Sequence, residues 1–320
     1  MKRIITLFFA FLILSLLAFA SLFIGVKDIV PSDLWNNTQA REVFFISRFP
    51  RTAALILVGC ALSVAGLIMQ LITQNKFVEP STSGATQSAS LGIILVTVLY
   101  PSASIMTKMI AASLMALFGS FLFLLILRRV SLKSAIIVPL LGMMLGAVIQ
   151  SLTTFLALHF DLLQSLISWD AGDFSNILRG RYELLWLIGI LTILACFSAD
   201  RFTIIGMGKE FSINVGLNYQ LTMIFGLLIV AVISGVVVVV VGTLPFLGLI
   251  VPNIVSLIVG DNVRKNIPWI CLLGGGIVLL CDILGRLVIM PFEIPAGSIM
   301  GVVGAALFLM IILRNRRYVH

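Results

Sequence analysis

Long apolar runs separated by short polar loops make up most of this chain, and that alternation limits what it can fold into. Of the 320 residues, 60% are hydrophobic and 11% are charged, and the mean hydropathy is +1.18. A soluble domain could not bury so much apolar surface. In lipid only helices and closed barrels satisfy their backbone, and these runs lack the alternation of barrel strands. The sequence therefore predicts an all-α polytopic membrane protein.

Ten apolar runs are predicted to form transmembrane helices, and the first of them is long enough to cross a bilayer, which takes about 20 residues. No linker or low-complexity segment interrupts them, so we expect residues 1–320 to form a single transmembrane domain. The first run is expected to remain as an uncleaved span. The runs cover approximately residues 4–26, 53–72, 83–100, 104–127, 135–158, 183–199, 219–241, 245–259, 268–290 and 296–313.

Ten spans place both termini on the same side of the membrane, and the distribution of cations indicates which side this is. The loops on that side contain thirteen Lys and Arg residues, whereas the opposite loops contain seven. Cytoplasmic loops carry the excess of such residues, so both termini are expected in the cytoplasm, together with a polar segment at 201–218. The net charge of +8 is thus distributed over short loops and leaves no basic face for nucleic acid.

The motifs of common enzyme classes are missing from the sequence. It contains no G-x-x-x-x-G-K-[ST], H-E-x-x-H or G-x-S-x-G, so we expect no catalytic residues and no ATPase activity in this chain. The four cysteines lie in apolar runs without C-x-x-C spacing, and both histidines are isolated, so no metal site is expected either. These residues are Cys60, Cys196, Cys271, Cys281, His159 and His320.

The polar segment at 200–218 repeats at intervals of four residues, as the faces of one helix do. It shows an apolar ridge, a stripe of small residues and a polar line. Such a ridge can enter a groove on a soluble partner. An amphipathic helix in the headgroup layer would show a similar pattern, usually with more cations. The three sets are Met207, Phe211 and Val215; Gly208, Ser212 and Gly216; and Glu210, Asn214 and Asn218.

A second polar stretch, Pro80–Gly92, overlaps the start of the third apolar run. If this stretch is part of a spanning helix, it could line a wet passage. The spacing of Gly84, Ser88 and Gly92 fits close helix packing equally well. The polar side chains of this stretch are Ser81, Thr82, Ser83, Thr86, Gln87, Ser88 and Ser90.

Charged and bulky residues mark both ends of the predicted helices. Asn75 and Phe77 lie in the cytoplasmic turn before the third run and could form an inner constriction. Arg48 and Arg51 lie on the outer side, where they could anchor a helix or bind carboxylates. Asp282 and Arg286 are one helical turn apart in the ninth run and could neutralise each other.

Six ordered segments resemble permease subunits of the iron-siderophore and vitamin B12 family of ABC importers, and the resemblance covers essentially the full length. It implies the type II importer permease fold with ten transmembrane helices, in the bacterial cytoplasmic membrane. The segments are Arg48–Arg51, Gly66–Pro80, the segment with Gly208, Ser212 and Gly216, Pro245–Pro252 with Gly260 and Asp261, Asp282–Arg286, and Glu293–Pro295.

The resemblance also implies partners. The chain would pair with a second permease, either another copy or a related protein, and the transport pathway would follow their interface. Two ABC ATPase subunits on the cytoplasmic side would hold the ATP and Mg, and a substrate-binding protein would dock on the outer side. Membrane lipid would surround the chain, which is expected to hold no cofactor of its own.

Roles for individual residues follow from the same resemblance. The polar segment becomes the coupling helix that contacts the ATPase. Three arginines would bind acidic residues of the binding protein, and the third span would face the pathway. The coupling residues are Met207, Gly208, Glu210, Phe211, Ser212, Val215 and Gly216; the docking arginines are Arg48, Arg51 and Arg286; the gate and pathway residues are Asn75, Phe77, Ser83, Gln87 and Ser88.

The chain departs from the family pattern at several positions. Asn253 and Ser256 replace the usual histidine and arginine, and Lys76 replaces a common proline. Two aspartates, Asp170 and Asp173, stand in the outer segment that follows Trp169. The nearest resemblance is to importers of catecholate-type ferric siderophores such as petrobactin; cobalamin or haem is the alternative substrate, and an ion-coupled secondary transporter is a more remote one.

Overall fold

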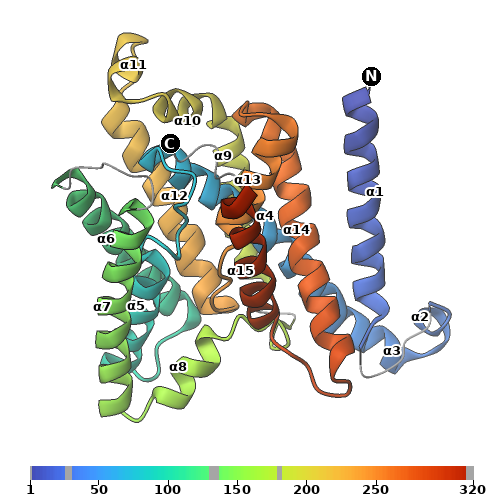
Figure 1. The fold of residues 1–320 in the computed structure, drawn as a ribbon. Coiled ribbons are helices and arrows are strands. Elements are labelled where there is room, and N and C mark those ends of the chain that lie inside the picture. The colour runs from blue at the N-terminus through green and yellow to red at the C-terminus, as the bar shows by residue number, and fades with distance from the viewer. Residues whose placement is uncertain (1, 26–30, 130–136, 179–181, 315–320) are drawn as a thin grey trace.

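The computed structural model describes residues 2–25, 31–129, 137–178 and 182–314 (Figure 1). Within these ranges every regular element is helical, which confirms the all-α prediction. The elements are α1 (Lys2–Phe23), α2 (Asp33–Asn36), α3 (Thr38–Val43), η1 (Phe44–Arg48), α4 (Phe49–Thr73), α5 (Ala85–Leu99), α6 (Ile105–Arg129), α7 (Ile137–His159), α8 (Leu163–Asp170), η2 (Tyr182–Leu185), α9 (Trp186–Phe197), α10 (Ala199–Gly206), α11 (Lys209–Asn214), α12 (Tyr219–Val240), α13 (Leu247–Val259), α14 (Val263–Val288) and α15 (Ala296–Arg314).

Not all the apolar runs form full-length transmembrane helices. Six stretches of the described residues are long and apolar enough to cross a membrane. A seventh is added if Glu183–Phe197 and Ala199–Gly206, which meet at a bend of 63°, form one broken crossing. Three further apolar helices are shorter: Ala85–Leu99, Leu247–Val259 and Ala296–Met310. The predicted count of ten is therefore not confirmed. The six stretches of the described residues that are long and apolar enough to cross a membrane are Thr6–Phe23, Thr38–Thr73, Ile105–Leu127, Ile137–His159, Tyr219–Val240 and Val263–Val288.

The second apolar run becomes helical well before its predicted start at residue 53. Helix α3 continues through the π-helical turn η1 into α4, which gives one helical stretch over Thr38–Thr73. The side chain of Asn37 caps its start by accepting two backbone N–H bonds of 3.0 and 3.3 Å. Arg48 and Arg51 thus lie on a helix and not in a loop, three residues apart and therefore on one face.

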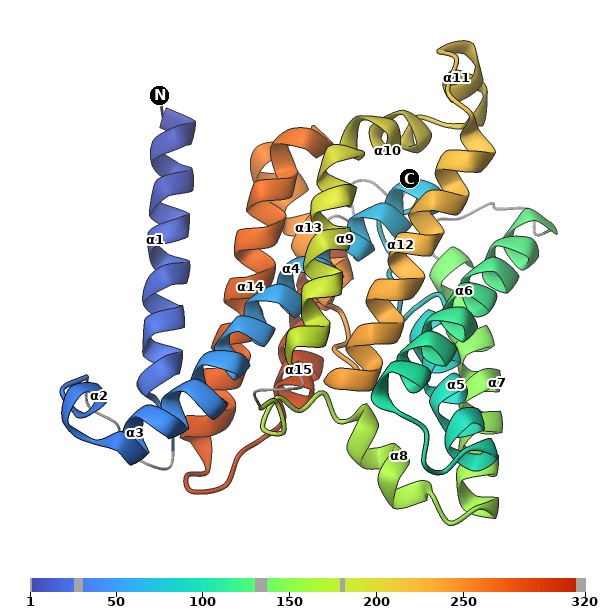
Figure 2. The same cartoon turned by 180° about the vertical axis from the view of Figure 1, so that it is seen from behind.

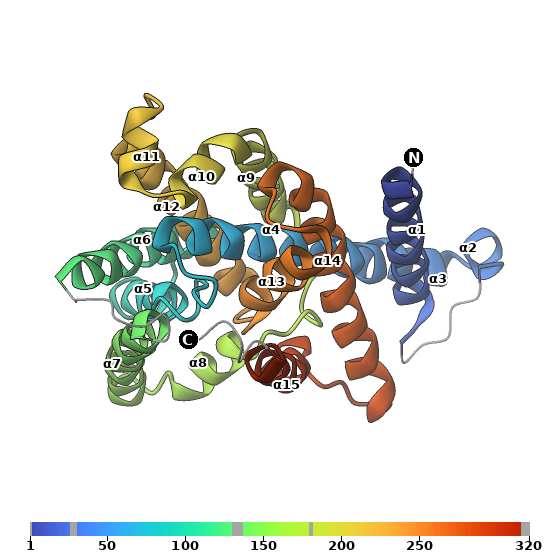
Figure 3. The same ribbon diagram turned by 45° about the horizontal axis from the view of Figure 1, so that its top comes forward.

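Helix α4 lies at the centre of the molecule, where it contacts α9, α12, α13 and α14 (Figure 3). Glycines allow two of these helices to approach closely. A Cβ on Gly66 would lie 2.0 Å from the carbonyl oxygen of Gly248 in α13, and one on Gly59 would lie 2.5 Å from that of Gly274 in α14. Close backbone contact at small residues is a common way for helices to pack in membranes.

A group of three helices flanks this centre on one side, and α1 flanks it on the other (Figure 2). On one side α5, α6 and α7 pack together, and α5 and α6 also pack on α12. On the other side α1 stands apart and contacts α14, α4 and η1. Leu14 and Ser21 of α1 are buried, whereas Phe8 is 63% exposed, so the second half of α1 packs more closely against the rest than the part around Phe8 does.

The polar segments lie at the two ends of the bundle. The start of α1 lies at the same end as α10 and α11, whereas α3, α8 and the turn after α14 lie at the opposite end (Figure 1). Because the excess of Lys and Arg predicts that the first end faces the cytoplasm, we call it the inner end and the other the outer end.

Candidate functional site

A network of buried charges lies at the outer end. The Arg51 guanidinium donates to Asp282 Oδ1 from Nη2 at 2.7 Å and from Nε at 3.1 Å, and Nη1 donates to Glu293 Oε2 at 2.8 Å. Arg286 Nη2 lies 2.6 Å from Asp282 Oδ2. We call Arg48, Arg51, Asp282, Arg286 and Glu293 the outer charge cluster. Its three cations and two carboxylates leave one net positive charge.

The cluster also holds the end of α1. Arg286 Nη1 donates to the carbonyl oxygens of Ser21 and Ile24 at 2.9 and 2.7 Å, and Nη2 donates to Ser21 Oγ at 2.7 Å. Arg48 Nη1 donates to the same Ile24 carbonyl. These bonds join the end of α1 to α14 and to the η1 turn.

The three arginines that were predicted to dock a binding protein differ in how accessible their side chains are. The side chain of Arg286 is only 2% exposed and that of Arg51 is 12% exposed, whereas Arg48 is half-buried. Arg286 therefore cannot reach a docked protein in this conformation, and the ion-pair interpretation fits it better. The sequence did not reveal that Arg51 joins Asp282, because 231 residues separate the two.

At the inner end, the turn after α4 holds the two residues predicted to form a gate. Asn75 is buried, and its Oδ1 accepts the Phe77 N–H at 2.9 Å, which stabilises the turn. The Phe77 ring lies edge-on to Phe308 of α15 at 6.0 Å between centroids, and Phe246 stacks on Phe308 at 6.2 Å. Phe77 thus belongs to a group of three rings contributed by three separate segments.

The same turn contains a buried carboxylate that the sequence did not single out. Glu79 is 2% exposed, and its two oxygens accept the backbone N–H groups of Phe246 and Leu249 at 2.8 and 3.0 Å. The Ser81 hydroxyl donates to the same carboxylate at 2.6 Å. Glu79 therefore satisfies the first amides of α13 from outside that helix, where an anion is also favoured by the helix dipole.

The three departures from the family pattern at the inner end contact one another. Asn253 Nδ2 donates to the Lys76 carbonyl at 2.7 Å, and Lys76 Nζ lies 3.1 Å from Ser256 Oγ and 3.0 Å from Asp261 Oδ1. Hydrogen bonds from the Ser256 hydroxyl and then from Lys76 lower the pKa of Asp261, which favours its carboxylate form. The turn after α4 is therefore bonded to the start of α13 by Glu79 and to the later part of α13 by these contacts.

The polar stretch Pro80–Gly92 begins as a turn, and the helix α5 starts only at Ala85. The Ser83 hydroxyl donates to the Pro80 carbonyl at 2.9 Å and that of Ser88 to the Gly84 carbonyl at 2.7 Å, and both side chains are buried. This favours the packing interpretation for these two serines.

Two other side chains of the stretch Pro80–Gly92 face α7 and α8. Gln87 is half-buried and faces Gly146 of α7, where an added Cβ would lie 3.3 Å from Gln87 Cδ. Ser90 Oγ donates to Asp170 Oδ1 of α8 at 2.8 Å, which gives that aspartate a structural contact.

The predicted coupling segment folds as two short helices rather than one. Gly208 has φ +109° and separates α10 from α11, and Gly216 has φ +84° just beyond α11. These values favour glycine and break the repeat that runs through them in sequence. The proposed small-residue stripe is therefore not one continuous helical face.

The apolar ridge of the coupling segment is exposed, as a contact surface requires. Met207 is 62% exposed, Phe211 46% and Val215 56%, and Glu210 is exposed beside them. Ser212 is fully buried, and its hydroxyl donates to the carbonyls of Ile204 and Gly208, at 3.0 and 2.7 Å. Ser212 thus fastens α11 to α10 rather than contacting a partner.

Comparison with known proteins agrees with this architecture. The Petrobactin import system permease protein FatD of Bacillus anthracis is 46% identical over 308 residues, which cover 96% of this chain and 91% of that protein. The Petrobactin import system permease protein YclN of Bacillus subtilis is also 46% identical, over 311 residues, covering 97% and 98%.

A solved structure of an inward-facing metal-chelate type ABC transporter superposes with a TM-score of 0.83. The superposed region covers 97% of this chain and 99% of the chain in that structure, at 22% sequence identity, which establishes a common fold. The family model of the FecCD transport family matches residues 13–314. With this match and the apolar helices described above, the chain is a multi-pass permease of the cytoplasmic membrane that belongs to the FecCD transport family.

Proposed function

We propose that this chain is the permease subunit of an ATP-driven importer for a ferric siderophore of the petrobactin type, which carries catecholate groups. The observation that carries the proposal is the 46% identity, over nearly the whole chain, to two permeases named for petrobactin import. The family membership supports the transport role itself, whereas the substrate rests on these relatives.

In this proposal the chain crosses the membrane ten times, with the three shorter apolar helices and the broken span completing the count. It forms a dimer with a second permease, binds two ATPase subunits at the inner end and accepts a binding protein at the outer end. Closure of the ATPases around ATP and Mg moves the coupling segment at 201–218, and this motion opens the pathway to one side at a time. The chain itself holds no ATP.

Uptake by iron-starved cells with and without the gene tests the proposal. Labelled ferric petrobactin should accumulate only when the gene and an active ATPase partner are present, and ferric hydroxamate should be unaffected. If uptake of cobalamin or haem depends on the gene instead, the importer role stands but the assignment of the substrate is wrong. Uptake that resists vanadate but stops with an uncoupler would instead indicate a secondary transporter.

The exposed ridge of the coupling segment predicts a coupling defect. Phe211→Asp places a charge in the apolar contact, so we expect co-purification of the ATPase to fall at least about tenfold and uptake to be lost. Asn214→Asp is the matched control, because Asn214 is exposed on α11 outside the ridge and gains the same charge. Normal uptake by the Phe211 variant would remove the ridge from the proposed contact.

Arg48 is the most accessible arginine of the outer charge cluster, so it offers the clearest test of binding-protein docking. Arg48→Glu should weaken binding of the loaded binding protein about tenfold or more, measured by surface plasmon resonance with the permease in nanodiscs. Arg41→Glu makes the same charge change at an exposed position of α3. An equal loss in both variants would indicate a general effect of charge and contradict a specific role for Arg48.

A further inference from the structure

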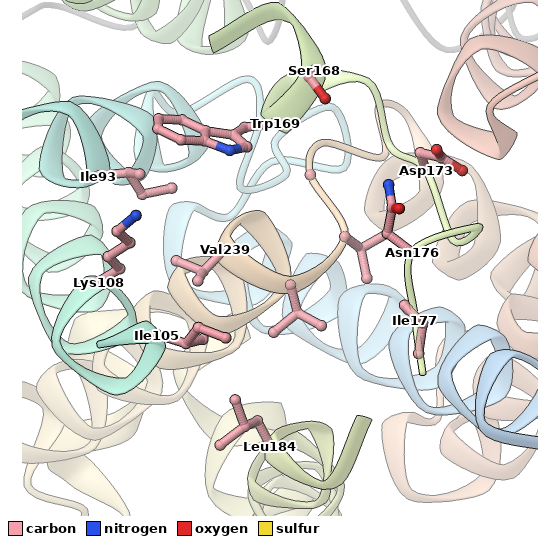
Figure 4. A pocket seen from close by; sticks show the side chains of 13 residues that line it. Ile93, Ile105, Lys108, Ser168, Trp169, Asp173, Asn176, Ile177, Leu184 and Val239 are labelled. Atoms are coloured by element: carbon pink, nitrogen blue, oxygen red, sulfur yellow. The ribbon is translucent and has the colours of Figure 1, made fainter. Parts of the chain in front are cut away.

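A cavity of about 280 Å³ lies at the outer end, where α5, α6, α8 and α12 meet (Figure 4). Its lining is divided into two parts. Lys108, Trp169 and Asp173 supply polar groups, whereas Ile105, Val239 and Leu184 supply apolar walls. None of its lining residues is among the proposed gate, pathway, docking or coupling residues.

The cavity contains one charge of each sign, and the two are not paired with each other. The Lys108 ammonium lies 5.3 Å from the centroid of the Trp169 ring, and no carboxylate of the described ranges forms an ion pair with it. The Asp173 carboxylate accepts the Ser175 N–H at 2.8 Å and the Ser175 hydroxyl at 2.6 Å, without a cation from the same ranges. A small anion in the cavity would be repelled by the Asp173 carboxylate, and a small cation would be repelled by the Lys108 ammonium.

Exposed apolar side chains also lie on the helices next to the cavity. Ile110 of α6 is 55% exposed and Ile190 of α9 is 57% exposed, as expected for side chains in contact with acyl chains. Lys108 and Trp169 stand at the outer ends of the helices, the level at which tryptophan and lysine meet phospholipid headgroups.

We propose that this cavity binds the headgroup of a zwitterionic aminophospholipid in the outer leaflet. The phosphate lies against Lys108, the ammonium lies against Asp173, and the glycerol region and the first acyl carbons cover the apolar walls. A ligand that carries both charges satisfies both side chains, which a simple ion does not. The arrangement is independent of the transported substrate.

Native mass spectrometry of the delipidated importer complex tests this site. The probes are phosphatidylethanolamine, phosphatidylglycerol and the soluble headgroup phosphoethanolamine. We expect the complex to retain phosphatidylethanolamine, and Lys108→Gln to reduce retention of both lipids about tenfold. Asp173→Asn should reduce retention of phosphatidylethanolamine about fivefold and leave phosphatidylglycerol unchanged, because the asparagine oxygen still caps Ser175. Arg264→Gln, an equal loss of charge at the inner end, should change neither.

Three results would overturn the proposal. Equal retention of phosphatidylethanolamine by the parent and both cavity variants would show that the lipid binds elsewhere. Tight binding of phosphoethanolamine alone would assign the cavity to a soluble zwitterion. Equal loss of phosphatidylglycerol and phosphatidylethanolamine in Asp173→Asn would show that this carboxylate does not select a lipid that carries an ammonium group. Unfolding temperatures of the lipid-free variants, compared with the parent, provide the control for folding.

Discussion

Glu79→Ala is expected to abolish transport and to lower the unfolding temperature of the detergent-solubilised protein. The substitution leaves the backbone N–H groups of Phe246 and Leu249 buried without an acceptor. Each such group costs about 1–3 kcal/mol. It also frees the turn that carries Asn75 and Phe77 from the start of α13. Thermal unfolding and uptake by cells measure the two effects.

Two further variants separate the helix contact from the carboxylate itself. Glu79→Gln retains one acceptor oxygen, so its unfolding temperature should fall between those of the parent and of the alanine variant. Ser81→Ala removes a hydroxyl from the same carboxylate but leaves both helix amides bonded, and should have a small effect. If Glu79→Ala unfolds at the temperature of the parent, Glu79 does not hold α13.

Asp282→Ala should be the most destabilising single change in the outer charge cluster. It leaves Arg286 buried without its carboxylate and removes two hydrogen bonds from Arg51. Removing one partner of a buried pair typically costs about 3–5 kcal/mol. Glu293→Gln should cost less, because the Glu293 side chain is 27% exposed. Unfolding temperatures of the purified variants measure this order.

A double substitution tests the cause of that loss. Asp282→Ala combined with Arg286→Leu removes both charges of this ion pair, so part of the stability should return, since apolar replacements of buried ion pairs are often tolerated. A double variant no more stable than Asp282→Ala alone would mean that the unpaired Arg286 charge is not the cause. The bonds from Arg286 to Ser21 and Ile24 are lost as well, so recovery should be incomplete.

Apolar length predicted the helical class correctly, because the backbone in lipid has few alternatives. It did not predict where helices begin. The run at 245–259 contains a helix of only 13 residues, whose first amides are satisfied by Glu79, far away in sequence. Hydrophobicity alone does not distinguish such a helix from a full crossing.

Patterns of local spacing did not reveal where the backbone departs from a helix. The repeat through Met207 and Phe211 correctly predicted an exposed ridge, but the break at Gly208 depends on a positive φ that periodicity does not reveal. Contacts between distant segments were missed for a different reason. Neither Arg51 with Asp282 nor Glu79 with α13 has a local pattern, because tertiary packing alone brings them together.

The way in which α1 is attached has a consequence for the response of the protein to its membrane. Arg286 and Arg48 hold the outer end of α1, whereas Phe8, Phe9 and Phe11, nearer its other end, are exposed. A helix fixed at one end can change its tilt at small energetic cost when the bilayer becomes thinner or thicker. Such tilting of α1 would absorb a mismatch in thickness before it reached α4 and α14.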